Sequence, residues 1–98
     1  MPRPFALRRI MSEPEVTYFK PAGVPLRALE EIVLGVDEFE ALRLVDSSQL
    51  GQKKAAEKMG VSQPTLSRML STGRKKVADT LAQGKALRID GGSYKVRV

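Results

Sequence analysis

The chain contains no cysteine, no histidine and no tryptophan. Without cysteine it has no disulfide framework, and without cysteine or histidine a zinc ion would lack its usual ligands. Histidine acid–base catalysis is excluded as well. Carboxylates alone remain a route to metal binding, although no pattern in the sequence favours it. No nucleophile has a recognisable base partner and no glycine-rich loop suits a phosphate, so we expect a protein that is not an enzyme and needs no cofactor.

Long apolar stretches and aromatic residues are also scarce. No run of about 18 apolar residues suggests a transmembrane helix, and the N-terminal sequence MPRPFALRRI lacks the apolar core of a signal peptide. We therefore expect a cytoplasmic protein without membrane contact. Aromatic residues make up 5% of the chain, which argues against recognition of single-stranded nucleic acid by base stacking. The 98 residues suffice for a single domain, residues 1–98, with one modest core.

Residues 52–70 have the spacing of two short helices joined by a tight turn. Apolar residues mark one face of each helix: Ala55, Ala56 and Met59 in the first, and Leu66, Met69 and Leu70 in the second. Between them, Gly60 suits the left-handed conformation that often ends a helix. Ser62 is placed to cap the second helix, and Pro64 falls in the first turn, where a missing N–H does no harm. This pattern is typical of a helix-turn-helix motif.

The second helix extends well past the motif. Its apolar stripe continues through Val77 and Leu81, so we predict one helix to about Ala82, ended by Gly84. At about 100° per residue, the side opposite the stripe carries mostly polar residues: Pro64, Arg68, Ser71 and Lys75, flanked by Thr65, Ser67 and Thr72. A guanidinium, short hydroxyls and an ammonium group are the chemistry expected of a helix that enters a DNA groove.

Positive charge is concentrated on the same segment. The chain as a whole has a net charge of +6. Residues 52–76 hold seven lysines or arginines and one glutamate, whereas residues 36–51 hold one arginine and four carboxylates. The predicted helix-turn-helix therefore carries the cations that contact with phosphates requires.

The first 24 residues contain four of the six prolines, which opposes a long helix. We predict an extended arm over residues 1–24, laid across the domain. Two interpretations of Arg3, Arg8 and Arg9 remain open: an arm that enters the DNA minor groove, or a basic terminus that makes no such contact.

The residues between the arm and the helix-turn-helix give mixed signals. A helix from Leu26 and an extended segment at 32–34 are both compatible with the sequence. Asp37 is placed to cap a helix beginning at Glu38, with Glu40 completing a capping box. A catalytic or metal-binding role for these three carboxylates is the alternative, but capping and the positive end of a helix explain them more simply.

Residues 85–98 change to the alternating period of β-strands. Apolar and basic residues alternate on either side of the turn sequence at 90–92, which predicts a β-hairpin over residues 85–98. Three roles remain open for it: a wing whose basic face touches phosphates, a dimerisation edge, or a cover for the core. We thus expect a mainly α fold, with three or four helices in residues 25–84 between an extended N-terminal arm and a small C-terminal β-hairpin.

Four ordered segments carry a resemblance to a known family: FKPAGVPL, VDEFEALRLVD, AAEKMGVSQPTLSRML with RKKVADTL, and GKALRIDGGSY. Over nearly the whole chain they resemble the UPF0251 (DUF134) family of small prokaryotic predicted DNA-binding proteins. The helix-turn-helix of that family is similar in turn to region 4 of sigma factors, whose recognition helix enters the major groove of promoter DNA. The resemblance implies a bacterial or archaeal protein with a sigma region 4-like helix-turn-helix.

The helical geometry assigns roles to the polar residues. Base-reading candidates lie at the start and on the outer side of the second helix: Gln63, Pro64, Ser67, Arg68 and Thr72. Candidates for phosphate contact are Lys53, Lys54, Ser62, Thr65, Ser71, Arg74, Lys75 and Lys76. Arg68 is the first choice for guanine, because a bidentate guanidinium contact contributes about 1–3 kcal/mol of discrimination. A phosphate contact or a surface ion pair is the alternative for this residue.

We expect sequence-specific binding of double-stranded DNA by a major-groove recognition helix, in a transcriptional regulator. Two alternatives stay open: a protein-interaction module that binds RNA polymerase or another partner, and a structured-RNA binder. A homodimer is expected, since one small module contacts few base pairs and two half-sites give useful specificity. The long helix beyond Leu70, the C-terminal hairpin and the helix near Leu29 are the candidate interfaces.

Overall fold

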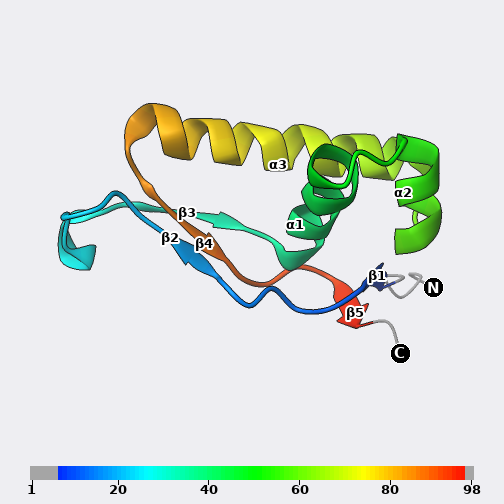
Figure 1. Cartoon of the computed structure of the whole chain (residues 1–98), viewed down its shortest axis with the longest axis horizontal. Helices are drawn as coiled ribbons and strands as arrows, with labels where there is room; N and C mark the ends of the chain where they lie inside the picture. The colour runs from blue at the N-terminus through cyan, green and yellow to red at the C-terminus, as the bar shows by residue number, and fades with distance from the viewer. Residues whose placement is uncertain (1–6, 97–98) are drawn as a thin grey trace, which may run out of the picture.

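The computed structural model describes residues 7–96, in which three α-helices lie against two small β-sheets (Figure 1). The helices are α1 (Val36–Leu42), α2 (Gln52–Met59) and α3 (Gln63–Gln83), with a 3-10 turn at Leu26–Ala28 and a π-helical turn at Arg43–Ser47 that continues α1. The strands are β1 (Arg8–Ile10), β2 (Tyr18–Phe19), β3 (Glu31–Leu34), β4 (Ala86–Ile89) and β5 (Tyr94–Val96). Helical residues outnumber strand residues, as the sequence predicts. No helix in residues 7–96 combines the length and apolar character needed to cross a membrane.

The two helices predicted in residues 52–70, and the turn between them, are confirmed. α2 ends at Gly60, whose φ of 66° lies in the left-handed region. α3 begins after Ser62, whose Oγ accepts a hydrogen bond from the Thr65 amide at 3.2 Å, and it ends at Gly84 as predicted. Together with α1 and its π-helical turn, these helices enclose a core of buried residues: Ala41, Leu44, Ala55, Ala56, Met59, Leu66, Met69 and Leu70.

Gly60 is expected to tolerate alanine less well than Gly84 does. Both glycines have a left-handed φ, 66° and 63°, which costs a residue with a Cβ about 1–2 kcal/mol. A Cβ at Gly84 would meet no other group within 4 Å, whereas one at Gly60 would lie 3.0 Å from guanidinium nitrogens of Arg9 and push it from its hydrogen bond with the Glu57 carbonyl. Urea denaturation should therefore show a larger loss of unfolding free energy for Gly60→Ala than for Gly84→Ala. Equal losses would show that the contact with Arg9 contributes nothing.

The prediction of a C-terminal β-hairpin over residues 85–98 is wrong. Within residues 7–96, β4 and β5 pair with other strands and not with each other. β4 lies between β2, to which it is antiparallel, and β3, to which it is parallel, while β5 pairs in parallel with β1. The turn at residues 90–92 lies beside the start of α1. There the Gly91 carbonyl accepts a hydrogen bond from the Val36 amide at 2.9 Å. Alternation of side chains marks a strand, but it does not identify the strand's partner.

The regions before α1 are more sheet-like than the sequence predicts. The N-terminal segment is extended, as expected, but β1 and β2 make its described part a component of the two sheets (Figure 1). Ile10 of β1 is only 1% exposed. It belongs to a second core, formed by Ile10, Leu34, Val36, Leu87 and Ile89. The helical core predicted for residues 25–84 is too broad, because Leu26 starts only a three-residue 3-10 turn and residues 31–34 form β3.

The start of α1 also differs from the prediction. The helix begins at Val36, two residues before Glu38, so a capping box formed by Asp37 and Glu40 is wrong. Gly35 precedes the helix, and its amide donates a hydrogen bond to the Glu38 carboxylate at 2.9 Å. Because the helix starts earlier, Asp37 and Glu40 fall inside it and are buried.

Candidate nucleic-acid interface

One face of α3 is turned away from the rest of the protein. The helix has 21 residues, a length of about 30 Å, and forms the upper border of the molecule in Figure 1. Its buried side, which includes Leu66 and Leu70, packs against α1 and α2. The outer face and the adjoining start of the helix carry exposed residues that all belong to the predicted site: Gln63, Pro64, Ser67, Arg68, Ser71 and Lys75. This face is therefore accessible to an external partner.

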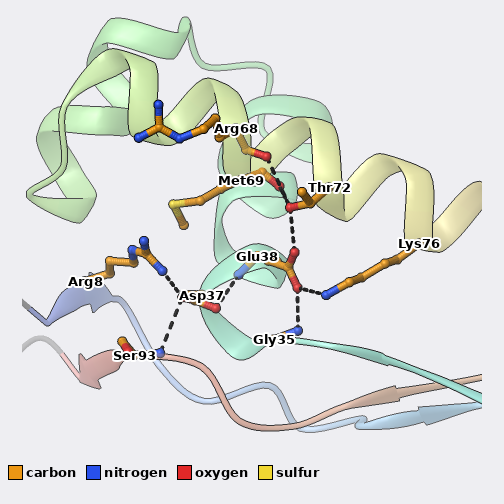
Figure 2. Close-up of polar contacts among 9 residues, drawn as sticks. All are labelled: Arg8, Gly35, Asp37, Glu38, Arg68, Met69, Thr72, Lys76 and Ser93. Carbon is orange, nitrogen blue, oxygen red and sulfur yellow. Dashed lines mark hydrogen bonds and ion pairs between the residues drawn. The ribbon is translucent and has the colours of Figure 1, made fainter. Parts of the chain in front are cut away.

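One flank of α3 is bound to α1 through Glu38, as Figure 2 shows. The Thr72 hydroxyl donates to one carboxylate oxygen of Glu38 at 2.7 Å, and the Lys76 ammonium donates to the other at 2.6 Å. The Gly35 amide donates to the same carboxylate. The sequence predicts that Thr72 contacts a base and Lys76 a phosphate. In the structure, both side chains form hydrogen bonds to Glu38.

Stability is expected to fall in acid partly because of Glu38. Burial acts to raise the pKa of its carboxyl group, but hydrogen bonds from Lys76, Thr72 and Gly35 outweigh burial and hold the pKa below its ordinary value of 4.5. Its contribution to the free energy of unfolding is therefore complete above pH 4.5 and is lost as the pH falls through the pKa of the folded state. Urea denaturation at neutral pH and at about pH 3.5 should show a smaller acid-induced loss for Glu38→Gln than for the wild-type protein. The same loss in both proteins would contradict this assignment.

Ion pairs compensate most of the positive charge in the C-terminal half of α3. The Arg74 guanidinium binds Asp46 through two hydrogen bonds, at 3.0 and 2.7 Å, and this contact holds the pKa of Asp46 below its ordinary value. Lys75 pairs with Asp79, one helical turn further on, at 2.8 Å. An exposed pair at this spacing contributes only about 0.3–0.5 kcal/mol, so Lys75 can exchange it for a phosphate at little cost. The bidentate Arg74 is held more firmly.

Among the three α-helices of residues 7–96, the cations without a carboxylate partner lie on α2 and the N-terminal half of α3. Within residues 7–96, these two segments contain four lysines or arginines that form no salt bridge: Lys53, Lys54, Lys58 and Arg68. Lys58 was not among the residues predicted for the site. Its position four residues after Lys54 places the two on one side of α2, and that spacing is the signal that would have found it.

A cleft of about 990 Å³ lies beside the N-terminal half of α3. Arg68 and Thr65 line it on the side of α3, and Arg8 and Asp37 line it from below (Figure 2). The lining contains as many carboxylates as cations. The cleft alone therefore does not select an anion.

The described residues of the predicted minor-groove arm are held against the domain. Arg8 pairs with the buried Asp37 at 2.5 Å, and Arg9 donates to the Glu57 carbonyl in the last turn of α2 at 3.1 Å. Arg3 lies outside the described residues. Arg8 and Arg9 are therefore parts of the folded domain, on a strand rather than on a free arm.

The acidic residues of α1 have partners within the protein. Glu40 binds Arg43 at 2.7 Å and accepts a hydrogen bond from the Met11 amide at 2.9 Å. Asp37 accepts one from the Ser93 amide in addition to its pair with Arg8. Asp37 thus binds β1 to α1, and Glu40 binds the residue that follows β1. In the part of the chain that the structure describes, no three potential metal ligands come together.

Comparison with known proteins relates nearly the whole chain to one family. The family model described as a protein of unknown function, DUF134, matches residues 1–97. A UPF0251 protein of Caldanaerobacter subterraneus is 53% identical over 98% of this chain and 81% of its own length, and one of Dehalococcoides mccartyi is 54% identical over 98% and 82%. A UPF0251 protein of Moorella thermoacetica is 57% identical over 96% of this chain, which spans only 63% of that longer protein. No solved structure shows a significant match. The chain therefore belongs to the DUF134 (UPF0251) family.

Proposed function

We propose that this protein binds double-stranded DNA sequence-specifically and regulates transcription in the cytoplasm of a prokaryotic cell. α2 and α3 then form a helix-turn-helix similar to region 4 of sigma factors, with α3 as the recognition helix. The observation that carries the proposal is the exposed outer face of α3, on a helix packed against α2, whose lysines form no salt bridge in the described part of the chain. The major groove of duplex DNA admits one α-helix, and the phosphates that border it attract cations.

Base recognition is assigned first to Arg68. Within residues 7–96 its guanidinium makes only a long contact, 3.4 Å to the Thr65 hydroxyl, so this contact does not prevent a bidentate contact with guanine. Gln63 is exposed at the start of α3 and suits adenine, while Ser67 is exposed one turn later. Pro64 offers an apolar surface for a thymine methyl group.

Phosphate contact is assigned to exposed or half-exposed groups whose contacts with the rest of residues 7–96 are absent or weak: Lys53, Lys54, Lys58, Ser71 and Lys75. Ser62 and Thr65 stay candidates because the recorded contacts of their hydroxyls lie within the start of α3 and include no carboxylate. Thr72, Arg74 and Lys76 are assigned to positioning α3 instead. They would have to leave short hydrogen bonds to carboxylates before they could contact DNA.

We further propose that the protein acts as a homodimer. Of the three interfaces expected from the sequence, the hairpin does not form, and the helix near Leu29 is only a 3-10 turn. The C-terminal half of α3 remains, where Leu81 is 79% exposed. A two-fold dimer through this half would present two recognition helices to two half-sites.

Selection of bound sequences from a random duplex DNA library, with the purified protein at near-physiological salt, tests the proposal. We expect a recovered motif, palindromic if the protein binds as a dimer. Salt-sensitive binding without a motif, or no binding, would contradict sequence-specific regulation. Tighter binding to a structured RNA competitor, or DNA-independent capture of RNA polymerase, would favour one of the two alternatives.

A further inference from the structure

A group of cations joins α2 to the ribbon formed by β1 and β5. We call it the ribbon patch: Arg9, Lys54, Lys58 and Lys95. Arg9 meets the two lysines of α2 around a depression of about 210 Å³ that also includes Glu57. Its guanidinium is fixed there by the hydrogen bond to the Glu57 carbonyl.

The strand register brings Lys95 to the same place. β1 and β5 are parallel, and Arg9 lies opposite Lys95. Residues that lie opposite each other on paired strands point to the same side of a sheet, while their neighbours point to the other side. Arg8 and Ile10 accordingly face α1 and the second core, whereas Arg9 and Lys95 are both exposed.

The ribbon patch lacks the neutralising carboxylates found elsewhere on the described surface. None of its four cations forms a salt bridge within residues 7–96, and Glu57 is the one carboxylate that lines the depression. By contrast, the exposed cations of β4 and of the C-terminal half of α3 all have an acidic partner. Lys20 and Arg27, between β2 and β3, also form no salt bridge within residues 7–96. The feature that favours a polyanion is therefore the grouping of four such cations on adjoining elements.

We propose that the ribbon patch binds the phosphate backbone of the same DNA duplex whose major groove receives α3. This inference rests on the proposed function and adds a second element, the β1–β5 ribbon, to the interface. Lys54 and Lys58 make the patch continuous with α2. The Arg9 guanidinium lies against Gly60, in the turn between α2 and α3, so the ribbon patch lies close to the start of α3. A strand of DNA that passes α3 on this side would meet the ribbon.

The test compares two variants that each lose two cations. Lys58→Ala with Lys95→Ala removes half of the ribbon patch and leaves Arg9, which has a structural contact, in place. The control, Lys20→Ala with Arg27→Ala, removes the same charge from the segment between β2 and β3, at the opposite end of the molecule from α2 (Figure 1). Fluorescence anisotropy with the selected duplex and a random duplex, over a series of salt concentrations, gives the slope of log affinity against log salt.

Each lost phosphate contact should reduce that slope by about 0.9, so we expect a reduction of about 1.8 for the ribbon variant. Specific and random duplexes should weaken by the same factor, because phosphates carry no sequence information. The control should keep the wild-type slope. A reduction of only about 0.9, which the loss of Lys58 on α2 would explain by itself, would overturn the assignment of the ribbon. An unchanged slope, or the same reduction in both variants, would overturn it as well, while base recognition by α3 would stand. A wild-type protein that binds no duplex would overturn both.

Discussion

Replacing Arg68 with alanine is expected to weaken binding to the selected duplex by roughly 5- to 150-fold, which corresponds to about 1–3 kcal/mol. The side chain is exposed and forms no salt bridge within residues 7–96, so the change removes little from the folded protein. Loss of a bidentate contact should also remove the preference for guanine at one position. Anisotropy titrations with the selected duplex, and with duplexes changed at one base pair at a time, measure both effects.

Two further variants separate base recognition by Arg68 from a simple effect of charge. Arg68→Lys keeps the positive charge but lacks the planar fork of the guanidinium, so we expect it to lose the base preference as the alanine variant does. Arg27→Ala removes one cation from the 3-10 turn, far from α2, and should change affinity only slightly. A lysine variant that keeps the full base preference would place Arg68 on a phosphate instead.

Replacing Asp37 with alanine is expected to lower the free energy of unfolding by about 3 kcal/mol. The side chain is 5% exposed, binds Arg8 of β1 and accepts hydrogen bonds from the amides of Glu38 and Ser93. It thereby connects the N-terminal strand, α1 and the segment that leads into β5 (Figure 2). Its removal leaves the guanidinium of Arg8, which is 28% exposed, without a carboxylate. Urea denaturation at neutral pH measures the loss.

Asp46→Ala is the matched control for this change. Asp46 also binds an arginine, Arg74, but the two side chains are 45% and 49% exposed. Solvent screens such a pair, which contributes about 0–1 kcal/mol. If the Asp37 and Asp46 variants lost the same stability, burial would not explain the role of Asp37.

The helices could be predicted from sequence because their signals are local. Gly60 and Gly84 supply the left-handed residues that end α2 and α3, and Ser62 supplies the cap, all within a few residues of the helices they bound. Strand pairing depends on residues far apart in the sequence. Phe19 pairs with Leu87, and Arg9 with Lys95, and no local pattern announces either partner. For this reason β4 and β5, which the sequence predicts to pair as a hairpin, belong to two different sheets.

In the candidate site, too, the features that depend on one helix could be predicted from sequence, and the contacts between distant residues could not. Helical periodicity identified the outer face of α3, including Arg68 and Ser71, because that face depends only on the helix itself. It could not show which cations are engaged elsewhere. Arg74 meets a carboxylate 28 residues away and Lys76 one 38 residues away, so their contacts follow from the tertiary structure alone.

Amide chemical-shift changes on addition of the selected duplex test the central claim most directly. We expect the largest changes in residues 52–58 and 63–71, which form α2 and the N-terminal half of α3, and small changes in β2, β3 and the 3-10 turn between them. Binding that shifts the sheet residues but leaves the amides of α3 unchanged would contradict a DNA interface on the outer face of this helix.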